Sequence, residues 1–312
     1  MLLLVLTGTA TAEAATPSCY GAAARDKMHP CRNPALRLAA QPQGSIATLI
    51  PNEPCTPLSI HGDYTDRDTG PLIPCAFGAQ TPASPRVVAL VGDSHAMALR
   101  AAVHGMAVNR GWVAIDMTRS HCPYSFASRD LEDRGEIRGC RTFNRRVIRY
   151  LTKHPFIDTI ISVGAAGGSQ VRTEPGADQF ETRVAGFQDA WQALPESVQH
   201  VIAVRDSPRM TNPENLGGCI RRAQKAKRPP GAACAQPRST ALLRDPAKVA
   251  ARRLRLARYS QIDLSEFVCD FTRCFPVVGG VLVFKDGQHL TRAFSTTLAP
   301  MLARRVARVV PD

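Results

Sequence analysis

From about residue 86 onward, short apolar runs alternate with longer helix-like stretches, and this alternation restricts the fold more than any other sequence feature. Five runs are typical of buried strands: Val87–Val91, Trp112–Met117, Ile157–Val163, His200–Val204 and Gln261–Leu264. Five stretches suit helices: Ala96–Asn109, Arg141–Lys153, Phe180–Leu194, Asp245–Tyr259 and about Thr291–Val309. Strands that alternate with helices form a parallel sheet with helices on both faces. The sequence therefore predicts a three-layer α/β/α sandwich with a mostly parallel, five-stranded, flavodoxin-like sheet.

The first 85 residues lack this pattern. Residues 1–15 begin with an apolar run, and Ala12-Glu13-Ala14 has the small-x-small form of a signal-peptidase site. This segment is predicted to be an export signal or the end of a truncated membrane helix. Residues 16–85 are rich in Pro, Gly and Asn without a sustained period, which indicates a loop-rich extension. We expect a globular domain over residues 86–312 to follow it.

The cysteines of the chain lie in close sequential pairs. Their even number and local pairing indicate disulfides, and no Cys-x-x-Cys or Cys/His spacing typical of a zinc site occurs. Disulfides persist in an oxidising compartment, so we expect a periplasmic or cell-surface location. Sequence alone does not fix their connectivity. The ten disulfide candidates, in chain order, are Cys19, Cys31, Cys55, Cys75, Cys122, Cys140, Cys219, Cys234, Cys269 and Cys274.

The formal net charge of +13 favours anionic partners such as envelope polymers or lipid headgroups. The basic residues are spread over predicted helices, and no aromatic-studded basic motif of a nucleic-acid-binding domain occurs. We therefore expect no nucleic-acid partner. The glycines of Gly164–Gly168 fit neither the dinucleotide fingerprint nor a Walker A loop, and no cofactor is expected.

Gly92-Asp93-Ser94-His95 directly follows the first predicted strand, and a predicted helix begins after it. This position places the Ser94 hydroxyl at the carboxyl end of the sheet, where open α/β sheets bind ligands. The N-terminus of the helix offers backbone N–H groups that can stabilise an oxyanion. Taken alone, Ser94 suits a helix cap as well as it suits a nucleophile.

Asp286 and His289 lie three residues apart, in a polar turn between an apolar hairpin and the last predicted helix. A nucleophilic serine needs a base, and an acidic residue beside the base can orient its imidazole ring. On spacing alone, a hairpin turn and a surface histidine would explain this pair as well.

In combination, these blocks resemble the SGNH domain that is often fused behind the membrane-embedded acyltransferase-3 domain of bacterial O-acyltransferases. In that family, Gly-Asp-Ser-His holds the nucleophile and an Asp-x-x-His near the C-terminus supplies the other two triad members. Further similar blocks appear in the expected order from Cys19 onward: Cys19–Ala23, Pro74–Gly78, Ser120–Pro123, Arg205–Arg209 and Gly279–Val283.

The resemblance implies that Ser94, Asp286 and His289 form the catalytic triad of an extracytoplasmic serine O-acyltransferase or carbohydrate esterase. It also implies an acyl-serine intermediate, an acyl group such as acetyl, and a cell-envelope polysaccharide or glycolipid as acceptor. An integral-membrane acyltransferase-3 protein or domain would be the partner that supplies the acyl group. No metal is expected.

The sequence departs from the wider SGNH superfamily, because no asparagine follows the third strand to donate to the oxyanion. We expect the backbone N–H groups of Ser94 and Gly164 to serve instead. Two other functions stay open. One is a non-catalytic glycan-binding module that partners a membrane acyltransferase. The other is a metallophosphoesterase, suggested by Gly92-Asp93-x-His95 and by a Gly-Asp-x-x-Asp at Gly62–Asp66, although the latter precedes the first block and no Gly-Asn-His occurs.

Overall fold

The computed structural model describes residues 16–58, 72–79, 86–168 and 170–311. Residues 1–15, predicted to be an export signal or the end of a truncated membrane helix, and the Gly-Asp-x-x-Asp block at 62–66 lie outside the described residues.

The central element is a seven-stranded sheet in the order β1-β2-β4-β3-β5-β6-β8. The strands β4, β3, β5, β6 and β8 are parallel, whereas β1 and β2 are antiparallel and form one edge. Strand order reverses between β3 and β5, so their carboxyl ends flank a ligand-binding crevice of the doubly wound kind. The bounds are β1 Thr56–Pro57, β2 Cys75–Gly78, β3 Val87–Gly92, β4 Val113–Thr118, β5 Ile157–Val163, β6 His200–Val204 and β8 Tyr259–Ile262.

The sheet has two strands more than the five that we predicted. Both come from the segment predicted as loop-rich, where β2 pairs with β4 through Ala76 opposite Ile115. Two-residue and four-residue strands between Pro-containing segments are too short to show an alternating pattern, which is why the sequence does not reveal them. Residues 75–78 therefore belong to the same sheet as the domain that we expected to start at residue 86.

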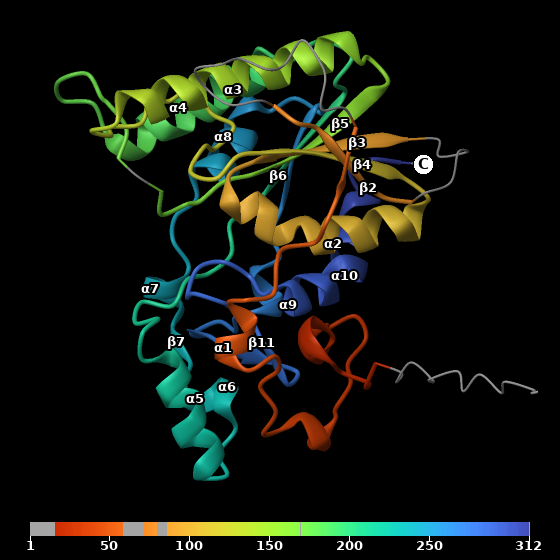
Figure 1. The fold of residues 1–312 in the computed structure, drawn as a ribbon, viewed down its shortest axis with the longest axis vertical. Coiled ribbons are helices and arrows are strands. Elements are labelled where there is room, and N and C mark those ends of the chain that lie inside the picture. The colour runs from red at the N-terminus through yellow and green to blue at the C-terminus, as the bar shows by residue number, and fades with distance from the viewer. Residues whose placement is uncertain (1–15, 59–71, 80–85, 169, 312) are drawn as a thin grey trace, which may run out of the picture.

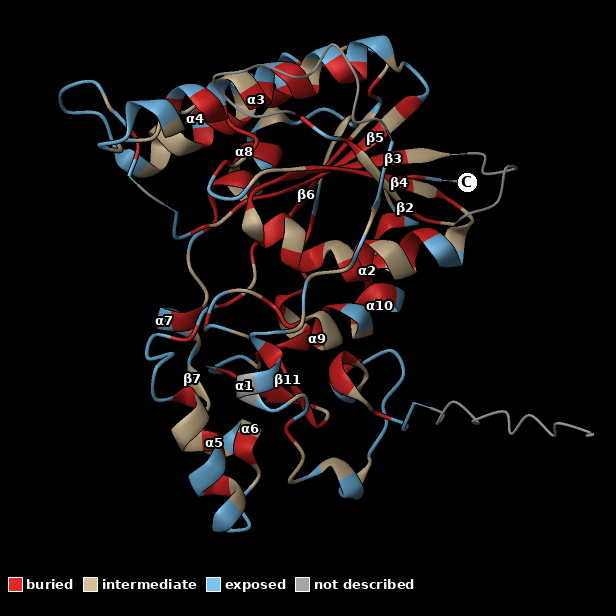
Figure 2. Cartoon of the chain, in the orientation of Figure 1, coloured by how far each residue is buried: buried red, intermediate tan, exposed pale blue. Residues whose placement is uncertain are grey.

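Helices cover both faces of the sheet (Figure 1). The helices α3 (Arg134–Lys153), α4 (Gln179–Gln192) and α8 (Pro246–Leu254) lie on one face, and α2 (Ser94–Arg110) lies on the other. The helices α9 (Arg292–Thr297) and α10 (Ala299–Val306) pack on α2. Alternate residues of β3 enter the two cores, Ala89 toward α3 and Leu90 toward α2. Figure 2 shows this burial as red strands between helices that are red only on their inner sides.

Several helix ends differ from the predictions. The first helix begins at Ser94 rather than Ala96, because the carboxylate of Asp93 accepts the His95 N–H at 2.9 Å and caps it. The helix predicted to start at Arg141 begins seven residues earlier, at Arg134. The helix predicted to reach Tyr259 ends at Leu254. The last helix is divided at Leu298 into α9 and α10.

The shorter elements gather at the other end of the molecule, where the N-terminal extension packs against the C-terminal hairpin (Figure 1). Backbone N–H groups of Gly21 and Gln41 donate to the carbonyls of Gly279 and Gly280 at 3.0 and 2.9 Å. These elements are η1 Gly21–Arg25, η2 Pro34–Leu36, α1 Gly44–Ala47, α5 Leu216–Lys225, α6 Pro230–Ala233, β7 Gln236–Pro237, α7 Arg238–Ala241, η3 Ser265–Phe267, β9 Arg273–Cys274, β10 Val277–Val278 and β11 Val281–Leu282.

The ten cysteines form five disulfides, each between sequential neighbours: Cys19–Cys31, Cys55–Cys75, Cys122–Cys140, Cys219–Cys234 and Cys269–Cys274. Within the described part of the chain, no helix combines the length and the apolar character that crossing a membrane requires.

Candidate active site

The turn between β3 and α2 brings Ser94 to the crevice at the carboxyl edge of the sheet. Gly92, the last residue of β3, has a φ of +140°, and a Cβ there would lie 1.8 Å from the carbonyl oxygen of Val163 at the end of β5. Only glycine permits this close approach. It lets the chain turn at once into α2, with Ser94 as the first helical residue.

Ser94, His289 and Asp286 form one continuous hydrogen-bonded chain. The Ser94 Oγ lies 2.8 Å from His289 Nε2, and His289 Nδ1 lies 2.7 Å from Asp286 Oδ2. The other oxygen of Asp286 accepts the backbone N–H groups of His289 and Gln288 at 2.9 and 3.2 Å. The structure thus brings together all three residues of the triad that the sequence predicts.

The pKa of Asp286 lies well below its usual range. Partial burial opposes ionisation, but the hydrogen bonds from the His289 side chain and from two backbone N–H groups outweigh it. Asp286 is therefore a carboxylate at neutral pH and accepts the proton carried by His289 Nδ1. This arrangement leaves His289 Nε2 free to accept the hydroxyl proton of Ser94.

A second histidine lies directly beside His289. The rings of His95 and His289 are 4.7 Å apart between centroids, and His95 Nδ1 lies 2.6 Å from Asp206 Oδ1. Both members of this ion pair are buried. Burial disfavours the charged imidazole, yet the adjacent Asp206 carboxylate outweighs it and raises the pKa of His95 to about 9. His95 is therefore an imidazolium at neutral pH.

The loop after β5 is fixed by three charged side chains, those of the buried Asp93 and Asp206 and of the half-buried Arg183. Asp93 Oδ2 accepts the Ala165 N–H at 2.8 Å, and Asp206 Oδ2 accepts the Ala166 N–H at 2.7 Å. From the other side, Arg183 of α4 donates to the carbonyls of Ala165 and Ala166 at 2.7 and 2.8 Å. Both peptide groups therefore have a fixed orientation in front of Ser94.

The backbone N–H groups of Gly167 and Gly168 in this loop differ in their hydrogen bonds. The Gly168 N–H donates to the Ala165 carbonyl at 3.2 Å, whereas the Gly167 N–H has no hydrogen-bond partner among the described residues. Gly167 lines the cavity beside Ser94. Gly164, the oxyanion donor suggested by the sequence, is buried against Phe187 and Pro123 and is not a lining residue of that cavity.

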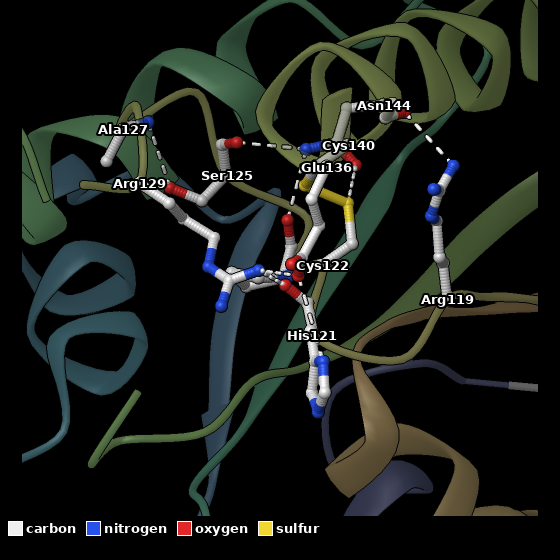
Figure 3. Close-up of a disulfide and its surroundings, with 11 residues drawn as sticks. Arg119, His121, Cys122, Ser125, Ala127, Arg129, Glu136, Cys140 and Asn144 are labelled. Atoms are coloured by element: carbon white, nitrogen blue, oxygen red, sulfur yellow. Dashed lines mark hydrogen bonds and ion pairs between the residues drawn. A yellow bond between two sulfur atoms is a disulfide. The ribbon is translucent and has the colours of Figure 1, made fainter. Parts of the chain in front are cut away.

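The cavity at Ser94 has a volume of about 240 Å³. The segment between β4 and α3 forms one wall of it, with Pro123, Ser125 and Arg129 among the lining residues. The disulfide Cys122–Cys140 joins this wall to α3 (Figure 3). On α3, the Asn144 amide donates to the carbonyls of Pro123 and Ser125 at 3.1 and 2.9 Å, and Glu136 pairs with Arg129 at 2.8 Å.

The groups that would bind metal in a phosphoesterase are engaged elsewhere. The two oxygens of Asp93 accept backbone N–H groups of His95 and Ala165, and His95 Nδ1 is paired with Asp206. In the part of the chain that the structure describes, no group of three or more His, Cys, Asp or Glu ligand atoms converges around Asp93 and His95. The arrangement suits acid–base chemistry at Ser94 better than metal binding.

Sequence comparison places this chain in a family. Residues 59–304 match the model of the SGNH domain that is fused to AT3 domains. The chain belongs to this SGNH family. The comparison with curated proteins returns no match.

Among solved structures, the chain is similar to the periplasmic domain of the lipopolysaccharide acetyltransferase of Salmonella ser. Paratyphi A. The two share 17% identity over 71% of this chain and 83% of that chain, with a TM-score of 0.51. A second similar structure is a carbohydrate esterase family 2 enzyme with a carbohydrate-binding domain from Corynascus thermopiles (Myceliophthora fergusii). It shares 14% identity over 74% of this chain and 68% of that chain, with a TM-score of 0.39. The first match agrees with the SGNH-like α/β fold.

Sequence reasoning assigned no role to Asp206, Arg183 or Gly167, although Asp206 lies in the Arg205–Arg209 block and Gly167 is one of the glycines of Gly164–Gly168. Asp206 had a signal, because it follows β6 closely, at the same carboxyl edge of the sheet as Ser94. Arg183 had none, since one basic residue on an amphipathic helix looks like any other. Gly167 was one of several glycines in its loop, and only the hydrogen bonds of its neighbours distinguish it.

Proposed function

We propose that this SGNH domain is an extracytoplasmic serine O-acyltransferase or carbohydrate esterase. The observation that carries the proposal is the chain from Asp286 through His289 to Ser94, in which both hydrogen bonds are within 2.8 Å. Such a chain supplies a nucleophile, a base and a group that orients the base.

In the first half-reaction, Ser94 Oγ attacks the carbonyl carbon of an acyl ester while its proton moves to His289 Nε2. The resulting oxyanion faces the backbone N–H groups of Ser94 and Gly167, which stabilise the negative charge. When the tetrahedral intermediate collapses, the ester C–O bond breaks and His289 gives its proton to the departing alkoxide. The product is an acyl-serine, and Asp286 stabilises the imidazolium throughout.

In the second half-reaction, His289 removes a proton from a sugar hydroxyl or from water as the oxygen attacks the acyl-serine. Collapse of this intermediate releases Ser94 Oγ, which recovers its proton from His289. A sugar acceptor makes the protein a transferase, and water makes it an esterase. The chemistry of the two outcomes differs only in the acceptor.

The family supports a partner and a location. Because SGNH domains of this family are fused to AT3 domains, we infer that an integral-membrane acyltransferase-3 protein or domain delivers the acyl group. Five disulfides favour an oxidising compartment, in agreement with the periplasmic domain from Salmonella. That protein acts in lipopolysaccharide acetylation, so an acetyl group and a cell-envelope polysaccharide or glycolipid acceptor are the first candidates here.

The test is turnover of p-nitrophenyl acetate in the presence and absence of envelope polysaccharide, with mass analysis of the sugar product. We expect p-nitrophenol release that requires Ser94, and acetylated sugar if the protein is a transferase. Wild-type protein that binds polysaccharide but releases no p-nitrophenol would favour the non-catalytic glycan-binding module instead. Turnover that Ser94→Ala retains would reject the proposed nucleophile.

A further inference from the structure

A second, larger cavity lies behind the turn that carries the proposed base. Its volume is about 550 Å³, and Asp286 and Gly287 form part of its wall. The next two residues of the same turn, Gln288 and His289, line the cavity at Ser94. One four-residue turn therefore separates the two cavities, and a long ligand in the larger one would end close to the proposed nucleophile.

The wall of the larger cavity has the composition of a carbohydrate site. Four apolar side chains contribute to it, those of Leu216, Ile220, Leu282 and Phe284. Gln41, Gln43 and Gln224 also line the cavity, and a glutamine amide can both donate to and accept from a sugar hydroxyl. The Gln224 Nε2 already donates to the Leu38 carbonyl at 2.9 Å, which leaves its amide oxygen for a ligand. Four charged groups in the wall, Glu214, Arg221, Lys285 and Asp286, balance one another. The cavity itself thus suits uncharged polar sugar units.

Helix α5 and the turn after it form a basic arm beside this cavity. The arm, residues 216–228, carries five exposed cations: Arg221, Arg222, Lys225, Lys227 and Arg228. None of them makes an ion pair with any residue that the structure describes. Arg221 lines the cavity, and Lys225 is four residues further along the same side of the helix. The disulfide Cys219–Cys234 fixes the arm to the body.

We propose that the larger cavity and the basic arm bind an anionic polysaccharide, with sugar units in the cavity and carboxylate or phosphate groups on the arm. The inference rests on the proposed function, because it identifies this polymer as the acyl acceptor. Beside a cavity whose own four charges cancel, the arm adds four further exposed cations, those of Arg222, Lys225, Lys227 and Arg228. Such a surface complements a chain whose charges are spaced along its length. A position next to the Asp286–His289 turn would deliver a hydroxyl of that chain to the acyl-serine.

The first test removes the charge of the arm. The dissociation constant for oligogalacturonate, a carboxylate-bearing probe, is measured by calorimetry with the Ser94→Ala protein, which makes binding independent of any chemistry. We expect the added Arg221→Gln/Arg222→Gln/Lys225→Gln substitutions to weaken binding about tenfold at low salt. The matched control is Arg138→Gln/Arg141→Gln/Arg149→Gln on α3, which removes three exposed cations from the opposite end of the molecule (Figure 1). We expect this control to bind within about twofold of the parent.

The second test fills the cavity with two adjacent glycines as a matched pair. A Cβ at Gly217 would meet only the tip of Arg221 at 3.4 Å, and one at Gly218 only the tip of Arg222 at 3.2 Å, so at both positions only a flexible side chain must give way to the first carbon. Gly217 lines the cavity and Gly218 does not. We expect Gly217→Phe to weaken oligogalacturonate binding at least as much as the charge variant does, and Gly218→Phe to bind like the parent.

Three results would overturn the inference. The first is an α3 control that weakens oligogalacturonate binding as much as the arm variant does. The second is a Gly218→Phe protein that binds oligogalacturonate as weakly as Gly217→Phe does. The third is binding to phosphatidylglycerol vesicles without binding to oligogalacturonate. The last result would identify the arm as a lipid-binding surface. A neutral malto-oligosaccharide, measured in parallel, should bind more weakly than oligogalacturonate. Failure of the proposed catalytic function would register separately, as absent p-nitrophenol release by the protein with Ser94 intact.

Discussion

His95 and Asp206 form a buried ion pair beside His289, with 2.6 Å between Nδ1 and Oδ1. Both charges have further partners around the site. Asp206 accepts the N–H of Ala166, and the negative charges of Asp93 and Asp286 also stabilise the charged His95 imidazole. The pair therefore joins the loop after β5 to the helix that begins at Ser94.

This ion pair predicts a stability change with pH. The pKa of His95 rises from 6.5 in the unfolded chain to about 9 in the folded protein, because Asp206 outweighs burial. The stabilisation is fully present below about pH 6.5 and is lost as the pH rises through about 9, a change of about 3 kcal/mol in the free energy of unfolding. Urea unfolding of wild type and His95→Gln between pH 6 and 10 measures it.

We expect the stability gap between wild type and His95→Gln to shrink over that window. His29, which is exposed, provides the control, and His29→Gln should change the free energy of unfolding by no more than about 0.5 kcal/mol at any pH. The pKa of the buried Asp245 is raised to about 6 by burial, so its own titration affects only the acid end of this pH range. A constant gap between pH 6 and 10 would contradict a charged His95.

Arg183 positions the loop that contains Gly167. Its guanidinium donates to two successive carbonyls, a geometry that the single ammonium of lysine does not reproduce. Arg183→Lys should therefore slow the acylation of Ser94 about tenfold, a loss of about 1.4 kcal/mol, with little effect on KM for a small ester. Arg172→Lys is the control, since Arg172 is exposed, and it should keep the wild-type kcat. A change in KM alone would argue against a role in oxyanion stabilisation.

The disulfide Cys122–Cys140 stabilises the wall of the cavity at Ser94. Its partners are 18 residues apart, so Cys122→Ala/Cys140→Ala should lower the free energy of unfolding by about 3 kcal/mol. Because Pro123 and Ser125 lose their covalent link to α3, acylation of Ser94 should slow as well. The bond Cys219–Cys234 spans 15 residues and is not part of this wall. Its removal should cost similar stability without slowing acylation by a small ester, and equal slowing would indicate general unfolding.

Gly92 is required by the approach of β3 to β5. Gly92→Ala would force a methyl group onto the Val163 carbonyl oxygen, so we expect a loss of more than about 4 kcal/mol or no soluble protein. Gly111 also has a positive φ, 64°, but a Cβ there would meet nothing within 4 Å. Gly111→Ala should cost only about 1 kcal/mol. Thermal unfolding of both variants checks this difference, and equal costs would mean that backbone conformation alone matters.

Four strands of the parallel core, β3, β4, β5 and β6, could be predicted because each is a largely buried apolar run of five to seven residues. The fifth, β8, has only four residues and one buried side chain, and the sequence predicted it two residues too late, at Gln261–Leu264. The antiparallel strand at Cys75–Gly78 could not, since its pairing with β4 depends on a neighbour distant in sequence. In the site, too, residues that belong to short motifs could be predicted, whereas contacts between distant parts of the chain could not. Ser94, Asp286 and His289 come from short motifs, so their numbers can be read from the sequence. Asp93, Asp206 and Arg183, which hold the loop after β5 by hydrogen bonds, come from three separate parts of the chain, and only folding brings them together.

The central claim is that Ser94 is a nucleophile activated by His289. Intact-mass analysis after exposure to a fluorophosphonate probe tests it most directly, with wild type, Ser94→Ala and His289→Gln compared over time. We predict one adduct on wild type, mapped to Ser94 by peptide analysis, no adduct on Ser94→Ala, and labelling slowed by at least about a hundredfold in His289→Gln. Labelling of Ser94→Ala at the wild-type rate would contradict the claim, as would a folded wild type that never labels.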